Sequence, residues 1–324
     1  MITTEVIIVG GGPAGSSCAA RLREHGVDCL VLDREPFPRL KLCAGWITPE
    51  VVRDLRMDPA HYPHSFLTFE TTVVHLYGLT FRLKAPQHSI RRIEFDNWLL
   101  ERAGVPVEVH DVRRIEHTGG YYQIDDRFRA RYLVGAGGTR CPVFRHLFRE
   151  HNPRAKRLQA LALETEFPCH WEDGDCHLWF FRRGLPGYSW YVPKANGYLN
   201  IGIGGIAEQL KQRHDDIKSH WQPFLKTLKR KGLLRSDPPP PGGYSYYLRA
   251  SVDTARVGNA FVIGDAAGLA TRDLCEGIGP AIRSGYAAAD SIALGQEYDL
   301  SSISRLSLEN NPMGRFLEKR FCRQ

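Results

Sequence analysis

The first 33 residues show the clearest order of apolar and polar positions in the chain. An apolar run rich in β-branched residues at 5–9 indicates a buried strand, and a glycine-rich turn follows at 10–15. Small and apolar residues at 16–25 are typical of a helix that ends at Gly26, and a second apolar run at 27–32 ends at Asp33. The pattern predicts a strand–helix–strand unit with parallel strands.

The rest of the chain changes pattern in the middle and then returns to the first one. A helix is predicted at 93–102, between strand-like patterns at 66–83 and 105–134. A further strand-like pattern follows at 160–206, then a basic helical stretch at 207–234 and a proline-rich linker at 238–243. A buried strand at 260–263 and a small-residue helix at 277–294 then resemble the opening. We therefore expect an interrupted nucleotide-binding domain with a β-rich insert. The predicted domains are 1–66, 92–158 and 250–296 for nucleotide binding, 67–91 and 159–249 for substrate, and 297–324 as a C-terminal tail.

Composition excludes several classes of protein. The chain has 324 residues, 43% hydrophobic and 24% charged, which is ordinary for a folded domain and excludes disordered, collagen-like and disulfide-scaffold proteins. No apolar run reaches the roughly 20 residues of a membrane span, and the first residues lack the basic segment of a secretory signal, so a cytoplasmic protein is expected. The eight cysteines lack paired metal-ligand spacing, and no metal site is predicted.

The glycine turn carries the first candidate chemistry. Gly10, Gly12 and Gly15 form a Gly-x-Gly-x-x-Gly pattern, with Pro13 and Ala14 in its last gap. Such glycines allow a tight turn, close approach of the backbone to a pyrophosphate, and close helix–strand packing. The helix N-terminus adds amide groups and a positive dipole. Asp33, followed by Arg34, ends the second strand, where an acid accepts from ribose hydroxyls. The pattern predicts a dinucleotide site.

The distal sequence indicates which dinucleotide. Residues 261–268 read Phe-Val-Ile-Gly-Asp-Ala-Ala-Gly, and a second glycine-opened helix begins near 277–279. Together with the first fingerprint, this arrangement resembles the FAD-dependent superfamily of p-hydroxybenzoate hydroxylase, the flavin halogenases and the geranylgeranyl reductases. The resemblance implies an α/β fold: a Rossmann-like, p-hydroxybenzoate hydroxylase-like FAD-binding domain with an inserted antiparallel β-sheet substrate domain. It also implies FAD binding by Gly264, Asp265, Gly277, Ile278 and Gly279, with Asp265 on the ribityl chain.

Two further segments resemble motifs of that superfamily. Residues 133–145 resemble its second glycine motif, with Gly137 where the family usually has an aspartate and Gly138 after it. The segment from Arg92 to Asp96 resembles the family's Arg-x-x-Phe-Asp helix start. The resemblance therefore implies that Arg92, Val112, Gly137 and Gly138 belong to the FAD site.

The middle of the chain resembles the geranylgeranyl reductase-like group in particular. Residues 186–194 look like its Tyr-x-Trp-x-Phe-Pro motif, in which Tyr188 and Trp190 would line the substrate cavity. Their period-2 spacing places both on one strand face. The segment 41–45 resembles a reductase loop that runs beside the flavin ring, which implies cofactor contact by Cys43, Ala44 and Gly45. Cys43, Tyr188 and Trp190 are the candidate catalytic residues.

The resemblance implies hydride transfer from reduced flavin to a hydrophobic acceptor, isoprenoid-like or flat and apolar. An FAD-dependent monooxygenase or halogenase is an open alternative, and a non-enzymatic flavin-binding redox partner is another. The net charge of +7 and the basic stretches at 207–234 and 315–323 favour an acidic electron-donor protein or contact with an anionic membrane surface, while NAD(P)H stays open as the donor. The charge does not by itself indicate nucleic acid, and none is expected as a partner.

Overall fold

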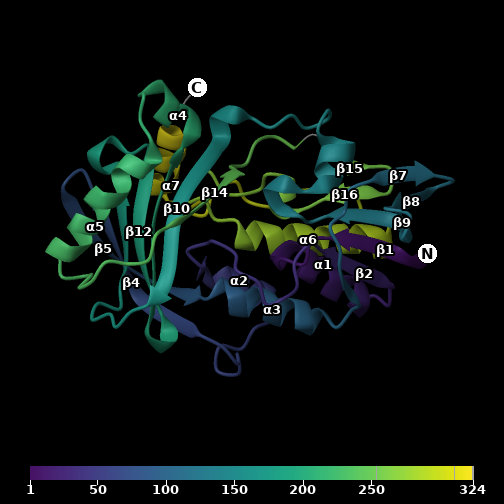
Figure 1. The fold of residues 1–324 in the computed structure, drawn as a ribbon, viewed down its shortest axis with the longest axis horizontal. Helices are drawn as coiled ribbons and strands as arrows, with labels where there is room; N and C mark the ends of the chain where they lie inside the picture. The colour runs from purple at the N-terminus through teal and green to yellow at the C-terminus, as the bar shows by residue number, and fades with distance from the viewer. Residues whose placement is uncertain (253, 310, 323–324) are drawn as a thin grey trace. The chain divides into compact units, whose positions relative to one another are not determined.

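The computed structural model describes residues 1–252, 254–309 and 311–322, and its contacts divide the chain into two compact units. Unit 1 comprises 1–39, 96–155 and 246–318, and unit 2 comprises 40–95, 156–245 and 319–324. Each unit contains its own large sheet (Figure 1). No helix of the described residues is long and apolar enough to cross a membrane.

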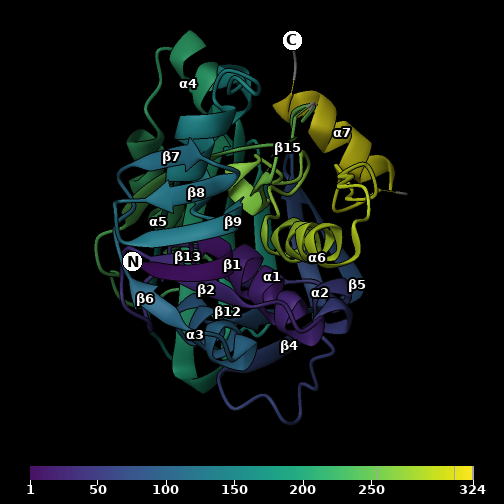
Figure 2. The same ribbon diagram turned by 90° about the vertical axis from the view of Figure 1, so that its right-hand side faces the viewer.

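Unit 1 is built on a mostly parallel sheet with the strand order β15-β16-β9-β1-β2-β6. A β7–β8 hairpin extends it antiparallel to β9, and Figure 2 shows these strands side by side. The bounds of the strands are β1 Ile2–Val9, β2 Cys29–Asp33, β6 Val107–Val109, β7 Ile115–Thr118, β8 Tyr121–Ile124, β9 Phe128–Gly135, β15 Arg256–Val257 and β16 Ala260–Val262.

Helices cover this sheet because its central strands are apolar on both faces. Along β1, Ile7 and Val9 belong to one core cluster, while Val6 and Ile8 belong to another on the opposite face. The helices of unit 1 are α1 Pro13–Glu24, most of α3 Arg92–Ala103, α6 Ile278–Leu294 and most of α7 Pro312–Phe321. Helices α1 and α6 lie side by side (Figures 1 and 2). A methyl on Gly285 of α6 would stand 2.5 Å from the Ala14 carbonyl oxygen of α1, so this glycine permits the close approach.

Unit 2 is built on a second eight-stranded sheet with the order β14-β10-β13-β12-β11-β4-β5-β3. The strand pairs β10–β13, β13–β12, β12–β11 and β4–β5 are antiparallel, while β4 and β11 pair in parallel. The strands are β3 Trp46–Ile47, β4 Phe66–Leu76, β5 Leu79–Ile90, β10 Gln159–Pro168, β11 Cys176–Phe180, β12 Gly187–Lys194, β13 Tyr198–Ile206 and β14 Gly242–Tyr247; the helices are α2 Pro49–Asp54, α4 Ala207–Gln212 and α5 Trp221–Arg230.

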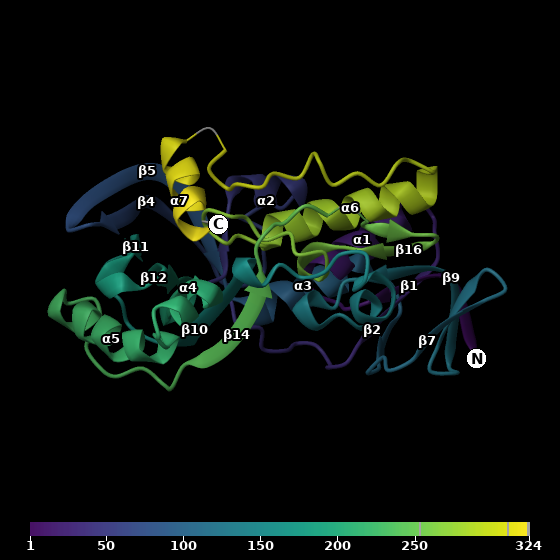
Figure 3. The ribbon, with the colours of Figure 1, turned by 90° about the horizontal axis from the view of Figure 1, so that it is seen from above.

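The two faces of this sheet differ sharply. On one face, Leu199, Ile201 and Ile203 of β13 form a core with Phe224 and Leu228 of α5, and Figure 3 shows α4 and α5 beside β10 and β12. Alternate residues point to the other face, where Tyr188 and Trp190 of β12 lie. The sheet register sets which residues join them there.

The contact division differs from the predicted domain boundaries by a few residues at several of them, and by longer segments in two cases. Residues 40–66, predicted in the nucleotide-binding domain, belong to unit 2, because β3 pairs with β5 through Trp46 and Ser89. Residues 297–318 belong to unit 1 instead of forming a separate tail. Leu300 and Ile303 are buried in its core, and the Leu308 amide donates to Asp273 at 2.8 Å.

Candidate functional site

The glycine loop of unit 1 is shaped by contacts that exclude side chains. Gly10 has a φ of +114°, and a methyl there would stand 2.5 Å from the Ala136 carbonyl oxygen. Gly15 lies so close to the Gly10 carbonyl that a methyl would overlap it. The Gly10 amide donates to the Leu32 carbonyl at 2.8 Å, which ties the loop to β2. The loop is therefore a tight and fixed strand-to-helix turn.

The start of α1 has the features of an anion cradle. Its N-cap is Gly12, and within the described residues no side chain caps the helix by a hydrogen bond. A methyl on Gly12 would meet the Arg39 guanidinium at 3.6 Å and no other described atom within 4 Å. Arg39 lies over the Phe37 ring, and its buried Nε–H has no hydrogen-bond partner among the described residues. A helix terminus without a side-chain cap, beside a guanidinium that has an unsatisfied N–H, fits a pyrophosphate group.

Asp33 is held next to this cradle. Its Oδ2 accepts from the Gly11 amide at 2.8 Å, and its Oδ1 accepts from the Glu35 amide at 3.1 Å. The Arg39 guanidinium lies 3.6 Å from Oδ2. A carboxylate has about four acceptor positions, so lone pairs are left for ribose hydroxyls. The neighbouring Arg34 side chain is exposed and pairs with Glu35.

The Gly-Asp motif at 264–265 lies against helix α1. Gly264, at a φ of +57°, donates its amide to the Ser284 hydroxyl, and a methyl on it would stand 3.0 Å from the Ala14 Cβ. A methyl on Gly277 would stand 3.3 Å from the Asp265 Oδ1, so the Asp265 carboxylate lies at the start of α6. The fold of unit 1 thus brings together the first glycine loop, the Gly-Asp turn and the second glycine-opened helix.

Arg154 supports the Gly-Asp turn and was missed from sequence. Its guanidinium donates to the carbonyl oxygens of Asp265 and Ala266, at 3.3 and 2.7 Å, and lies over the Phe144 ring. Burial lowers the pKa of Arg154, and the nearby Asp265 charge opposes that shift. Nothing in the sequence around residue 154 indicates this role, because the contact spans 111 residues.

The remaining predicted FAD residues occupy different positions. Gly137 packs beneath the first loop, since a methyl on Gly10 would stand 2.7 Å from its amide nitrogen, and Gly138 has a φ of +68°. Val112 is buried in the unit 1 core, and Ile278 is buried at the start of α6. The Gly279 amide donates to Glu276 at 2.7 Å and is therefore engaged within the chain. Arg92 begins α3 and is grouped with unit 2.

In unit 2, the aromatic pair lies on the sheet face opposite α5. Trp190 is buried and its Nε1 donates to the Asn200 side-chain oxygen at 2.7 Å. Its ring covers Gly202, where a methyl group would overlap the indole. The half-buried Tyr188 ring lies 5.8 Å from Trp190 and 5.2 Å from Phe180. The predicted pair is brought together on a wall built across several strands.

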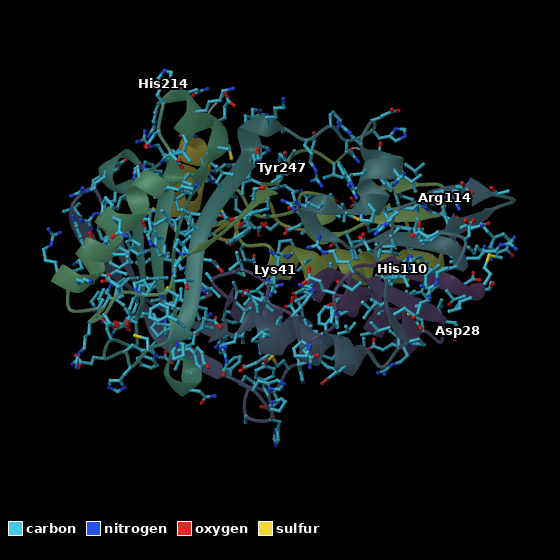
Figure 4. All side chains as sticks on the ribbon, in the orientation of Figure 1. Asp28, Lys41, His110, Arg114, His214 and Tyr247 are labelled. Carbon is cyan, nitrogen blue, oxygen red and sulfur yellow. The ribbon has the colours of Figure 1, made fainter. Side chains whose placement is uncertain are left out.

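The Cys43 loop is fixed to the same sheet by two polar side chains. The Asn200 amide donates to the Cys43 carbonyl at 3.3 Å. Lys194 is fully buried and its Nζ donates to the carbonyls of Ala44 and Ile90. Burial lowers the pKa of Lys194, while nearby carboxylates oppose the shift. Lys41, labelled in Figure 4, lies over the Tyr244 ring with its Nζ 4.7 Å from the ring centroid.

The structure also adds a buried carboxyl to this face. Glu164 of β10 is 2% exposed, and its Oε2 has no hydrogen-bond partner within the described residues. In the sequence, Glu164 stands between Leu163 and Thr165 in a predicted strand. An ordinary solvent-facing acid shows the same pattern, so the sequence did not indicate that Glu164 is buried. No cluster of His, Cys, Asp and Glu in the described part of the chain has the geometry of a metal site.

The comparison with known families decides the cofactor. Residues 3–57, which contain the glycine loop and Asp33, match the FAD binding domain family. FAD is the cofactor of this chain. The predicted FAD-dependent oxidoreductase class and the predicted fold class are confirmed.

Relatives extend over nearly the whole chain. The digeranylgeranylglycerophospholipid reductase 2 of Methanosphaera stadtmanae is 24% identical over 345 residues, which cover 98% of this chain and 86% of the relative. The menaquinone reductase of Mycolicibacterium smegmatis is 27% identical and covers 92% and 78% of the two chains. These matches bear out the predicted resemblance to the geranylgeranyl reductase-like group.

Solved structures share the fold. A geranylgeranyl bacteriochlorophyll reductase-like protein from Thermoplasma acidophilum superposes with a TM-score of 0.78 at 18% identity, over 99% of this chain and 82% of that one. The flavin-dependent brominase Bmp2 superposes with a TM-score of 0.70 at 21% identity, over 92% and 81%. The fold therefore serves both reductases and halogenating enzymes.

Proposed function

We propose that this FAD-dependent oxidoreductase is a reductase that transfers a hydride to a hydrophobic, isoprenoid-like acceptor. The observation that carries the proposal is a row of residues across the sheet of unit 2. Cross-strand pairing aligns Trp190, Leu178, Val74 and Phe81 on one face, running from β12 to β5. Trp190, Leu178 and Val74 are buried, and Phe81 is 41% exposed. Such a row suits a long apolar ligand, and two relatives act, by name, on a geranylgeranyl lipid and on menaquinone.

The residues that would hold FAD follow from unit 1. The amides at the start of α1 and the Arg39 guanidinium would bind the pyrophosphate, and Asp33 would bind the adenosine ribose. Asp265 and the start of α6 would bind the ribityl chain and the pyrimidine edge of the flavin. Reduced FAD supplies the hydride, and the protein supplies the orientation of the acceptor and a proton.

Anaerobic single turnover tests the reaction. The purified protein is reduced with dithionite without oxygen and then mixed with menaquinone or with a geranylgeranyl ether phospholipid in detergent. We expect the oxidised flavin spectrum to return and the probe to gain two hydrogen atoms by mass. Flavin reoxidation that requires oxygen and adds oxygen to the probe, or halogen in the presence of halide, would replace the reductase assignment with the monooxygenase or halogenase alternative.

The electron donor is proposed from charge. We propose a small acidic carrier protein, because α5 ends in Lys229 and Arg230 and the surrounding segment is basic. The donor is tested by comparing flavin reduction by NADPH and by reduced ferredoxin at low and high salt. Reduction by ferredoxin that falls with salt supports the proposal, whereas salt-independent reduction by NADPH contradicts it.

A peripheral membrane position is proposed from the edge of unit 2. The side chains of Leu79, Phe81 and Leu83 alternate along one face of β5 and are all at least 41% exposed; we call them the β5 stripe. An exposed apolar stripe on a chain with a net charge of +7 suits an anionic bilayer surface. The stripe also leads into the Trp190 row, so an isoprenoid acceptor would enter from the lipid. We propose that it does so on the cytoplasmic side.

A further inference from the structure

Glu164 is a buried acid to which the proposed function assigns no role. It lies near the middle of β10, in the same cross-strand row as Gly202 and Trp190. A methyl on Gly202 would stand 2.8 Å from the Glu164 Cβ and would overlap the Trp190 ring. The glycine therefore brings the carboxyl and the indole together across β13.

One oxygen of this carboxyl is unsatisfied. The side chain accepts a hydrogen bond from the Cys43 amide and interacts with the Asn200 side chain, but its Oε2 is buried without a partner among the described residues. A buried polar atom without a partner is costly, and an unpartnered charge is more costly still. Oε2 is therefore suited to carry a proton and to meet a group that the described residues do not provide.

The charged neighbours of Glu164 do not bring the pKa of its carboxyl back to the ordinary value. Lys194 from β12 and Lys41 from the Cys43 loop favour the charged form of Glu164, and Tyr244 of β14 is a further titratable group near it. Lys194 donates its protons to the carbonyl oxygens of Ala44 and Ile90. Burial dominates and raises the pKa of Glu164 to about 7, so about half of the molecules carry the proton at pH 7 and most carry it below that pH.

Other groups on this face are less suited to give up a proton. The Cys43 Sγ accepts a hydrogen bond from the Gly45 amide at 3.4 Å and is engaged within its own loop. Burial raises the pKa of Tyr244 well above its ordinary value, with the Glu164 charge adding to the shift, which makes the phenol a weaker acid. The Trp190 indole is already bonded to Asn200.

We propose that Glu164 is the proton donor to the hydrophobic acceptor. The inference rests on the proposed reductase function. The acceptor double bond becomes a single bond: one of its atoms takes the hydride, with both electrons, from reduced FAD, and the other takes the proton from Glu164 Oε2. The acceptor would be reduced by two electrons, which bound reduced FAD would supply. Solvent then returns a proton to the Glu164 carboxylate.

Single-turnover kinetics of the FAD-loaded protein test the role. With menaquinone or the geranylgeranyl ether phospholipid as the probe, we expect the E164Q variant to reoxidise its flavin at least about 100-fold more slowly than the wild type. The wild-type rate should fall by about tenfold per pH unit above neutrality, following the protonated fraction of the acid, and E164Q should lose this dependence. E164D, which retains an acid, should recover part of the rate.

The matched control is Glu166, two residues along β10 on the same face. It is ion-paired to Arg91 at 2.8 Å, and E166Q should retain the wild-type pH profile. Infrared difference spectra supply a readout that needs no turnover: a protonated carboxyl band should disappear between about pH 5 and about pH 9 in the wild type and be absent from E164Q.

The outcomes separate this inference from the proposed function. A wild-type protein that reduces a probe alongside an equally fast E164Q with the same pH profile would overturn the proton-donor role alone. Failure of the wild type to reduce either probe overturns the reductase function and the catalytic role with it. If E164Q does not fold, a wild-type infrared spectrum without the carboxyl band, or E164D at the wild-type rate and pH profile, contradicts the proposal.

Discussion

Two glycines of the first loop differ in what a methyl group would meet. Gly10 has a positive φ and lies against the Ala136 carbonyl, whereas Gly12 has an ordinary φ of −73° and faces the Arg39 guanidinium. We expect G10A to lower the free energy of unfolding by more than about 2 kcal/mol, because alanine disfavours the positive φ and its methyl group would clash with the Ala136 carbonyl oxygen.

G12A is the matched variant for the cofactor. Its backbone conformation suits alanine, so stability should stay within about 1 kcal/mol of the wild type. The methyl would occupy the cradle in which we place the pyrophosphate, and FAD should be lost on gel filtration. Urea unfolding and the flavin absorbance of the eluted protein measure the two effects; full retention of FAD by G12A would contradict the assigned pyrophosphate site.

Glu164 also predicts how stability depends on pH. Burial raises its pKa from 4.5 to about 7, so the folded state binds more protons than the unfolded state between these values. The stabilising contribution of the protonated acid is fully present below the unfolded value and is lost as the pH rises to the folded one. The shift corresponds to about 3 kcal/mol. Urea unfolding from about pH 4.5 to about pH 8 should show this decline in the wild type and a flatter curve in E164Q.

At the scale of elements, β13 is adapted to the aromatic residues on its neighbour. Gly202 leaves room for the Trp190 indole, and overpacking a core of this kind costs about 1–3 kcal/mol. We expect G202A to lower the free energy of unfolding by that amount. In a W190A background, the same methyl should cost much less, because the ring it overlaps is gone. Equal losses in both backgrounds would exclude this contact as the cause.

Elements defined by local signals were predicted well from sequence. The strand–turn–helix–strand pattern of 5–33 corresponds to β1, α1 and β2, and the helix predicted at 277–294 is α6 Ile278–Leu294. The glycine turn and the apolar runs are contiguous, so periodicity alone identifies them. The basic stretch at 207–234 was predicted as helical throughout. It forms α4 and α5, separated by His214 in the left-handed region.

What the sequence did not reveal depends on long-range pairing. Trp46 joins the second sheet by pairing with Ser89, which no local pattern indicates. Glu164 stands between Leu163 and Thr165, as a solvent-facing acid in a strand could, and its burial follows from neighbours on β12 and β13. Arg39 and Arg154 acquire their contacts with Asp33 and with Asp265 by the fold of unit 1. The roles of these residues depend on contacts between segments that lie far apart in the sequence.

At the scale of the whole molecule, the β5 stripe predicts vesicle binding. The protein should sediment with vesicles that contain phosphatidylglycerol and be released by salt, because anionic lipid attracts a basic protein within a Debye length. The F81S/L83S variant should bind at least about fivefold less, since burying each apolar side chain contributes more than about 1 kcal/mol.

A control variant distinguishes the stripe from general stickiness. Leu294, at the end of α6, is 54% exposed, and L294S should bind vesicles as the wild type does. Equal binding by wild type, F81S/L83S and L294S would show that the stripe is not the contact.

The outer side of β5 has a consequence for solutions of the purified protein. Among the described residues, β3 pairs with β5 on that side at Ser89 and His88, which leaves most of the strand open to another chain. Lys84 and Pro86 lie in the part of β5 that β3 does not pair with, where a charge and a missing amide hydrogen hinder addition of a further strand. A K84V/P86V variant should therefore assemble into fibrils that bind thioflavin, while the wild type stays dispersed. Lys84 and Pro86 would then prevent polymerisation through the open edge of β5, the strand that also carries the exposed apolar β5 stripe.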